Sequence, residues 1–389
     1  MAQLVRRNQA LLSEDQKRLL VTAVWNVKSR GDYDQFTKAH AEGANYYHHV
    51  PTFLPWHREF VRIFETALPT PPGQQTLTIP YWDWTDTNDP WSVWADYFMG
   101  GNGREGDDRV MTGPFAVSNG WFCVDPTREI PSYLRRQFGA GADHLPTADD
   151  VSGCLAMTPY DSAPWEGVSQ SFRKSLEGVI TPNIHNRVHR WIGGNMELAS
   201  SPNDPVFWLH HCNIDRLWAM WQQQHPNETY LPQSGGPQGQ NVDDLMPPWS
   251  NVRVSAVLDH RRLGYVYDTE NPTAQGDHMY PGDTLRSGDS ISSGDGRYRL
   301  VYETDGNLVL YQDGERTPQW SSQTQRRSPG MCVMQMNGDL TIDDADGQRV
   351  WSLGINGRGN RLRLTVDGAL EVTGLSGAMA WRSTRHVMA

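Results

Sequence analysis

Apolar residues recur every three or four positions in the first two thirds of the chain, a spacing that predicts amphipathic helices. One such stripe runs from Ser13 to about Ser29, and a second helix is expected after Asp32. Two more helices are expected after Thr181 and after Asp204, because each is a helix-capping residue followed directly by a proline. The first part of the chain is therefore predicted to be mainly α-helical.

The pattern changes near residue 268, where the helical period ends and three similar blocks follow. Each block has a turn dipeptide between alternating strand-like residues and then one tryptophan: Asp305-Gly306 with Trp320, Asn337-Gly338 with Trp351, and Asp367-Gly368 with Trp381. Such repeats predict a threefold β-structure around a shared aromatic centre. We expect a mainly α domain over residues 1–270, a linker over 271–280 and an all-β domain over 281–389.

Composition limits the classes of partner. The net charge of −11 comes from interspersed acidic residues, and no stripe of lysine or arginine would attract a phosphate backbone, so nucleic acid is not an expected partner. No apolar run reaches the roughly 18 residues that a membrane-spanning helix needs. The first residues contain no apolar signal-peptide core, so we expect either a cytoplasmic protein or one exported with a partner protein.

Three histidines in the middle of the chain are candidate metal ligands. His185 and His189 are one helical turn apart, so both imidazole rings can face one point. Such a pair alone is more often a surface or packing feature. His211, however, lies on the apolar stripe of a tryptophan-rich helix, and a buried imidazole needs partners for its ring nitrogens. The three rings together predict a metal site with imidazole ligands.

The N-terminal region repeats this arrangement with His40, His48 and His57. Pro51 and Pro55 prevent His48 from sharing a helix with His57, so His48 is expected on a loop. Helical histidine pairs that converge from distant parts of the chain are typical of a metal site inside a four-helix bundle. Six imidazoles without a carboxylate favour a redox copper pair over a dizinc hydrolase, whose bridging hydroxide usually has carboxylate ligands.

Several long motifs in this region resemble those of the type-3 copper proteins, and among them the bacterial tyrosinases. HHVPTFLPWHREF resembles the motif of the first copper, and LEGVITPNIHNRVHRWIGGNM followed by SPNDPVFWLHHCNIDRLW resembles that of the second. The resemblance covers about residues 4–270. It implies two copper ions as cofactors, the first held by His40, His48 and His57 and the second by His185, His189 and His211.

The resemblance also implies the reaction. Tyrosinases use O2 as co-substrate to hydroxylate monophenols at the ortho position and to oxidise o-diphenols to o-quinones, so small phenols are the expected substrates. Glu177 and Asn186 match the family pair that holds a deprotonating water, which a phenol needs because its pKa is about 10. Arg190 and Leu198 correspond to positions at the substrate entrance. A separate copper-loading chaperone is a further expected partner.

Two features depart from the family pattern. His48 follows His40 after only eight positions, a shorter interval than in the best-known bacterial members, and His49 competes with His48 as a ligand. Tyr46 lies where fungal and plant members often carry a cysteine linked to a ligand, so no thioether is expected. The short interval leaves open a catechol or o-aminophenol oxidase without monophenol activity. An oxygen carrier with the same copper pair is a further alternative.

The C-terminal repeats resemble the bulb-type mannose-binding lectins, whose fold is a β-prism of three subdomains. The sugar-binding pattern of that family is Gln-x-Asp-x-Asn-x-Val-x-Tyr, and the first repeat has Glu303, Asp305, Asn307, Val309 and Tyr311 at these positions. A carboxylate in place of the amide removes donors that a sugar hydroxyl could use. The resemblance implies at most one weak mannose-type site. The alternatives are a carbohydrate-binding protein whose enzyme half modifies bound material, a structural accessory domain, and a cap over the copper site.

Overall fold

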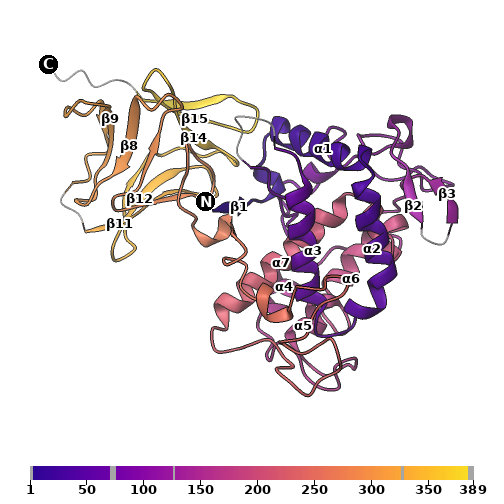
Figure 1. The fold of residues 1–389 in the computed structure, drawn as a ribbon. Helices are drawn as coiled ribbons and strands as arrows, with labels where there is room; N and C mark the ends of the chain where they lie inside the picture. The colour runs from indigo at the N-terminus through magenta and orange to yellow at the C-terminus, as the bar shows by residue number, and fades with distance from the viewer. Residues whose placement is uncertain (1–2, 71–75, 126–127, 326–327, 384–389) are drawn as a thin grey trace. The chain divides into compact units, whose positions relative to one another are not determined.

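A computed structural model describes residues 3–70, 76–125, 128–325 and 328–383 of the chain (Figure 1). The chain divides into two compact units. The helical unit contains residues 8–10 and 15–265, and the β unit combines described residues up to 7 and 11–14 with those from 266 onward.

The helical unit consists of α-helices joined by irregular segments. Within the described ranges the helices are α1 (Glu14–Ser29), α2 (Asp32–Tyr47), α3 (Phe53–Ala67), α4 (Ala148–Leu155), α5 (Phe172–Glu177), α6 (His185–Ile192) and α7 (Val206–Gln224). Short 3-10 helices are η1 (Gln9–Leu11), η2 (Ser92–Trp94), η3 (Val117–Asn119), η4 (Gly194–Glu197), η5 (Ser201–Asn203) and η6 (Val254–Val257). The strands β2 (Cys123–Asp125) and β3 (Arg128–Ser132) pair in a small sheet. The mainly α prediction for this part is confirmed.

Helices α3 and α7 pack against each other through aromatic side chains. Phe60 and Phe64 of α3 lie against Trp208 of α7, and the rings of Phe64 and Trp208 stack with their centroids 3.7 Å apart. Large rigid rings that interdigitate at interior packing density allow little sliding between helices. The layer therefore fixes the spacing of two helices that each carry candidate metal ligands.

One predicted helix start was wrong. The helix expected after Thr181 begins only at His185. The reason is Asn183, whose φ of 61° is a left-handed conformation that does not continue into a right-handed helix. His185 and His189 nevertheless share one helix, α6, so the geometric basis for pairing them is unaffected.

The β unit contains three four-stranded antiparallel sheets within the residues described. Their strand orders are β10-β9-β8-β7, β13-β12-β11-β6 and β16-β15-β14-β5. The strands are β5 (His278–Met279), β6 (Thr284–Arg286), β7 (Ser290–Ser292), β8 (Tyr298–Tyr302), β9 (Leu308–Gln312), β10 (Trp320–Ser321), β11 (Pro329–Met334), β12 (Leu340–Asp344), β13 (Arg349–Ser352), β14 (Arg361–Leu364), β15 (Leu370–Thr373) and β16 (Met379–Arg382). In addition β1 (Leu4–Arg6) pairs with β4 (Tyr265–Tyr267), and the 3-10 helix η7 (Asp268–Glu270) follows.

Each sheet comes largely from one sequence repeat. The turn glycines Gly306, Gly338 and Gly368 have φ values of 85°, 87° and 78°. Residues with a side chain rarely adopt this backbone conformation. Trp320 contacts Trp351 and Trp381 edge to face, with ring centroids 6.0 Å and 6.2 Å apart. The threefold β-prism with a shared aromatic centre is confirmed. Strand β5 falls within the predicted linker, residues 271–280, and pairs with β14. The domain boundaries expected from the sequence stay a prediction.

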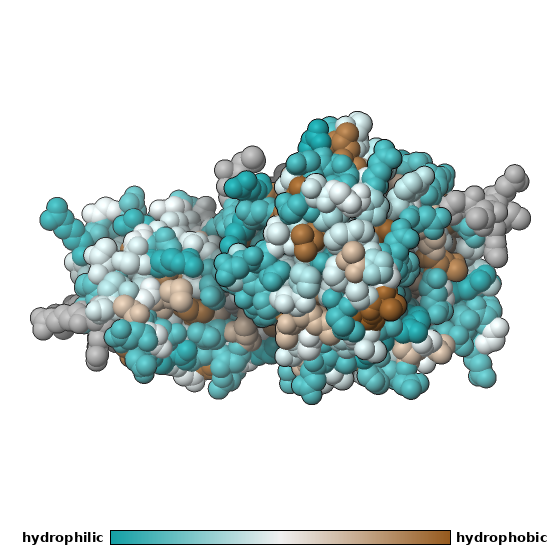
Figure 2. Space-filling view, turned by 90° about the horizontal axis from the view of Figure 1, so that it is seen from below, coloured by the Kyte–Doolittle hydropathy of each residue, from teal (hydrophilic) through white to brown (hydrophobic). Residues whose placement is uncertain are grey.

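Hydrophilic residues dominate the face shown in Figure 2, where apolar residues form small separate groups. Several of the largest aromatic side chains, such as those of Trp56, Trp208 and Trp218, are buried instead, whereas that of Trp91 is exposed. Among the described residues, no helix combines the length and the apolar character needed to cross a bilayer.

Candidate metal centre

The first histidine cluster joins α2, the loop after it and α3. His40 lies on α2, His48 caps the C-terminus of that helix, and His57 lies on α3. One potential ligand atom from each of these histidines lies within 4.8 Å of the others. The Nε2 atoms of His40 and His57 are 3.4 Å apart. The structure thus brings together the three residues predicted for the first metal.

Backbone carbonyls orient all three rings of this cluster. The Nδ1 atoms of His40, His48 and His57 lie 2.6 Å, 3.1 Å and 2.8 Å from the carbonyl oxygens of Ala199, Ala44 and Phe53. A carbonyl oxygen only accepts, so each Nδ1 carries the proton and each Nε2 keeps its lone pair. This is the tautomer and orientation that a metal-ligating histidine requires.

The second cluster joins α6 and α7 and contains His185, His189, His210 and His211. The Nε2 atoms of His185 and His211 are 3.3 Å apart. The Nδ1 of His189 lies 2.5 Å from the carbonyl oxygen of Met196. The Nδ1 of His185 lies 2.8 Å from Oδ1 of Asn186. His210 was not predicted for this cluster, and the adjacent histidines in LHHC were its only sequence signal.

The two clusters share one interior. The rings of His57 and His211 stack with centroids 4.4 Å apart, and the ring of His48 lies 6.3 Å from that of His185. A pair of metal ions held by the two clusters would therefore be neighbours. This is the arrangement needed for two metals to act on one small ligand.

The imidazoles fit a pair of copper ions. Nitrogens bound to one ion at about 2.0–2.1 Å in a tetrahedral arrangement lie roughly 3.3 Å apart, which matches the closest Nε2 pair of each cluster. Burial lowers the pKa of His48 and His189 to about 4, and it also lowers the pKa of the other five histidines well below the ordinary value. The rings are therefore neutral at pH 7, as ligands must be. All-nitrogen ligation suits copper.

His49 lies outside the clusters. Its side chain is 63% exposed, and its backbone has a left-handed φ of 61°. The ring of His49 therefore lies at the surface, whereas the ring of His48 lies in the first cluster. The geometry therefore favours His48 over its neighbour as the ligand.

Glu177 is fully buried beside the first cluster, so the alternative of a solvated helix residue was wrong. Its Oε1 accepts from the backbone N–H of His49 over 2.5 Å, and its Oε2 accepts from Nη1 of Arg173 over 2.8 Å. Arg173 is buried too and pairs with Asp161 at 2.7 Å. Sequence reasoning missed Arg173, because its partner Asp161 lies in a separate loop.

The predicted partner of Glu177, Asn186, lies close to it in the fold. The Nδ1 of His185 lies 3.2 Å from the backbone oxygen of Glu177 and 2.8 Å from Oδ1 of Asn186. Arg190 and Leu198, predicted at the substrate entrance, are both exposed, and the side chain of Leu198 is 51% exposed. Their position on the surface is compatible with an entrance, and that role stays a prediction.

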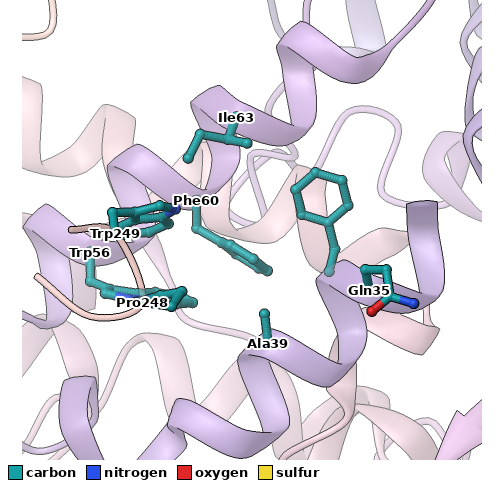
Figure 3. A pocket seen from close by; sticks show the side chains of 8 residues that line it. Gln35, Ala39, Trp56, Phe60, Ile63, Pro248 and Trp249 are labelled. Atoms are coloured by element: carbon teal, nitrogen blue, oxygen red, sulfur yellow. The ribbon is translucent and has the colours of Figure 1, made fainter. Parts of the chain in front are cut away.

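An apolar pocket of about 190 Å³ lies behind the first cluster, between α2, α3 and the segment at Pro248 and Trp249 (Figure 3). Phe60 and Trp56 form its inner wall, and their rings lie 5.9 Å and 6.0 Å from the ring of His40. The pocket is thus separated from the histidines by one layer of aromatic rings.

The predicted sugar-binding residues lie together on the first repeat of the β unit. The hydroxyl of Tyr311 donates to Oε1 of Glu303 over 2.9 Å, and the backbone N–H of Asn307 donates to Asp305 over 3.0 Å. The side-chain oxygen of Asn307 accepts from Ser322 and from the backbone of Thr324. Val309 is buried. The polar groups are thus largely bonded to one another.

Comparisons with known proteins agree with this geometry. The family described as the common central domain of tyrosinase matches residues 30–224. A tyrosinase from Streptomyces antibioticus is 45% identical over 273 residues, covering 68% of this chain and 99% of the relative. A solved polyphenol oxidase from Thermothelomyces thermophila is similar with 26% identity and a TM-score of 0.55, covering 68% of this chain and 88% of its own. A monomeric mannose-binding lectin from Gastrodia elata is similar over 28% of this chain and 96% of its own, with 26% identity and a TM-score of 0.25.

Proposed function

Because the chain belongs to the tyrosinase family of dicopper oxidases, we propose that its two histidine clusters hold the copper pair and that phenols are its substrates. The ligands proposed are His40, His48 and His57 for the first copper ion and His185, His189 and His211 for the second. The convergence of Nε2 atoms in each cluster, joined by the stacked rings of His57 and His211, is the observation that supports this assignment.

When bound, the copper pair supplies O2 activation and the oxidising power for the overall reactions. A monophenol and O2 give an o-quinone and water, and two o-diphenols and one O2 give two o-quinones and two waters. The protein contributes a fixed, neutral set of imidazoles, so no proton has to leave a ligand at neutral pH before the metal binds. It also has to remove the phenol proton, since the unperturbed pKa of a phenol is about 10.

Glu177 is the proposed acceptor of that proton, through a water held with Asn186. Two donors fix its carboxylate, and the main chain of Glu177 and the amide of Asn186 both contact the ring of His185. A carboxylate placed in this way beside a ligand can accept a proton through one water without moving. Glu177 also bonds the backbone next to His48, so it positions the loop that carries this ligand.

Oxygen consumption by the copper-loaded full chain tests the proposal, with L-tyrosine as monophenol and catechol as diphenol. Turnover of both supports a tyrosinase, whereas catechol turnover alone identifies a diphenol oxidase. Reversible O2 binding without turnover identifies a carrier. Glu177→Gln should lower the rate with L-tyrosine much more than the rate with catechol, because catechol has a second hydroxyl and a lower first pKa. Glu166→Gln, on an exposed side chain, is the matched control.

Arg190 is proposed to attract phenols that carry a carboxylate. L-Tyrosine and tyramine differ in that group, so Arg190→Met should raise KM for L-tyrosine and leave KM for tyramine nearly unchanged. A parallel rise for both phenols contradicts this role. Leu198 is proposed to line the same entrance with its exposed apolar side chain, and Leu198→Ala should change KM for both phenols equally.

The β unit is proposed to carry one weak mannose-type site on its first repeat, formed by Glu303, Asp305, Asn307, Val309 and Tyr311. The match of four of five residues to the lectin pattern supports it. Calorimetric titration with methyl α-mannoside tests it, and no heat at millimolar sugar contradicts it. A copper-loading chaperone is the second proposed partner. Full loading of the metal-free chain by free copper alone would make that partner unnecessary.

A further inference from the structure

His210 differs from the other histidines of the metal centre. It is completely buried, and neither of its ring nitrogens has a hydrogen-bond partner among the residues that the structure describes. Five of the six proposed ligands instead have an acceptor beside Nδ1. Burying a polar group without a hydrogen-bond partner is unfavourable, so the position of this imidazole in the core needs a physical reason.

The reason lies in its surroundings. The centroid of its ring is 5.0 Å from that of His185, 4.9 Å from that of His189 and 5.1 Å from that of His211. One potential ligand atom from each of the four rings lies within 4.8 Å of all the others. His210 therefore lies as close to the three proposed ligands of the second copper as they lie to one another. Within the described residues, the second cluster thus contains four histidines and the first cluster three.

We propose that His210 provides a fourth nitrogen ligand for a zinc(II) ion in the second metal pocket. With this ligand the pocket becomes a closed, four-coordinate site made only of imidazoles. The inference rests on the second cluster being a metal site, as proposed above, but it does not depend on phenol oxidation. Zinc in closed protein sites is almost always tetrahedral with four protein ligands, whereas a catalytic metal keeps one position open. A metal that binds O2 or a phenol there uses three imidazoles, and His210 then stays unbound.

The chain's own geometry makes this ligation conditional. Among the described residues, none forms a hydrogen bond with the ring of His210, so no such bond fixes its orientation. The rings of His185 and His189 are fixed by acceptors at Nδ1. The second pocket should consequently bind zinc more tightly than the first, because it offers four imidazoles instead of three.

Zinc binding by the metal-free full chain tests the proposal without any activity measurement. In a crystal soaked with zinc alone, the zinc of the second pocket should lie about 2.0–2.1 Å from a ring nitrogen of His210 as well as from the other three histidines. In competition with a chromophoric chelator, His210→Phe should weaken the tighter zinc site about tenfold or more and leave the weaker site unchanged. His225→Gln is the matched control, since His225 ends the same helix and bonds the carbonyl of Leu155.

Each outcome decides the question. A zinc ion held by three histidines, with His210 more than about 3 Å away, overturns the proposal. So does a tight site that His210→Phe leaves unchanged, provided that circular dichroism shows the variant to be folded. If the variant does not fold, the zinc-soaked wild-type crystal decides alone. A failure of the proposed function would appear separately, as wild-type protein that binds copper at both clusters and leaves catechol unoxidised.

Discussion

Arg58 and Asp215 form a buried ion pair between the two helices at the centre of the helical unit. The Nε of Arg58 lies 2.5 Å from Oδ1 of Asp215, and the side chains are 0% and 3% exposed. Arg58 directly follows His57 on α3, and Asp215 lies one turn after His211 on α7. The hydroxyl of Tyr265 donates to the other carboxylate oxygen over 2.5 Å. The pair therefore connects the two helices beside the stacked ligand rings.

Breaking this pair should strongly destabilise the helical unit. Arg58→Met removes the buried cation that compensates the carboxylate of Asp215, and removing one partner of a buried ion pair typically costs about 3–5 kcal/mol. Urea unfolding of the metal-free protein, followed by near-UV circular dichroism, measures the loss. The control is Arg30→Met, because Arg30 and Asp32 form an exposed pair that contributes at most about 1 kcal/mol. Equal losses in the two variants would contradict the prediction.

Copper content should distinguish His48 from His49. We expect His48→Ala to lose one copper ion per chain, because its ring belongs to the first cluster. His49→Ala should retain both ions, since its side chain is largely exposed and it contributes its backbone N–H, which alanine keeps. Atomic absorption of the copper-loaded, desalted proteins provides the count. Loss of copper from the His49 variant alone would transfer the ligand role to that residue.

The features that the sequence predicted are those carried by local repetition. The turn dipeptides recur at regular intervals, and the structure has a hairpin turn at each. His185 and His189 were paired from helical geometry alone, and they share α6 even though that helix begins later than expected. The left-handed conformation of Asn183 had no signal in the sequence, because asparagine is common both in such positions and near helix starts.

The features that were missed depend on contacts between distant segments. Helix α7 is buried over nearly its whole length, so the apolar stripe that singled out His211 could not show that His210 lies in the same cluster. Arg173 reads as an ordinary helical cation until the loop at Asp161 is placed beside it. Glu177, four residues later on the same helix, is a local partner of Arg173, but the ion pair with Asp161 gives no periodic pattern in the sequence.

Trp320 should be the most important of the three repeat tryptophans for the β unit. It is 8% exposed and contacts both Trp351 and Trp381, which are less buried. Replacing a buried tryptophan by alanine typically costs about 3–5 kcal/mol. Trp320→Ala should therefore lower the unfolding midpoint of the β unit more than Trp351→Ala. Hydrogen exchange of the amides in β8 and β9 reports the stability of the β unit separately from that of the helical unit. Equal protection of these amides in the two variants would count against this ranking.

A single carboxylate limits the proposed sugar site, and an amide in its place should strengthen it. Glu303 accepts from the hydroxyl of Tyr311, and the amide oxygen of Glu303→Gln can keep that bond while its NH2 group donates to a sugar hydroxyl. One added hydrogen bond contributes about 0.5–1.5 kcal/mol, so the affinity for methyl α-mannoside should rise by about twofold to tenfold. Glu315→Gln makes the same chemical change at an exposed position of the same repeat and should leave the affinity unchanged. Calorimetric titration of both variants measures the difference. A Glu303→Gln protein that binds no better than wild type would show that the internal bonds of Asn307, rather than the missing donor, weaken the site.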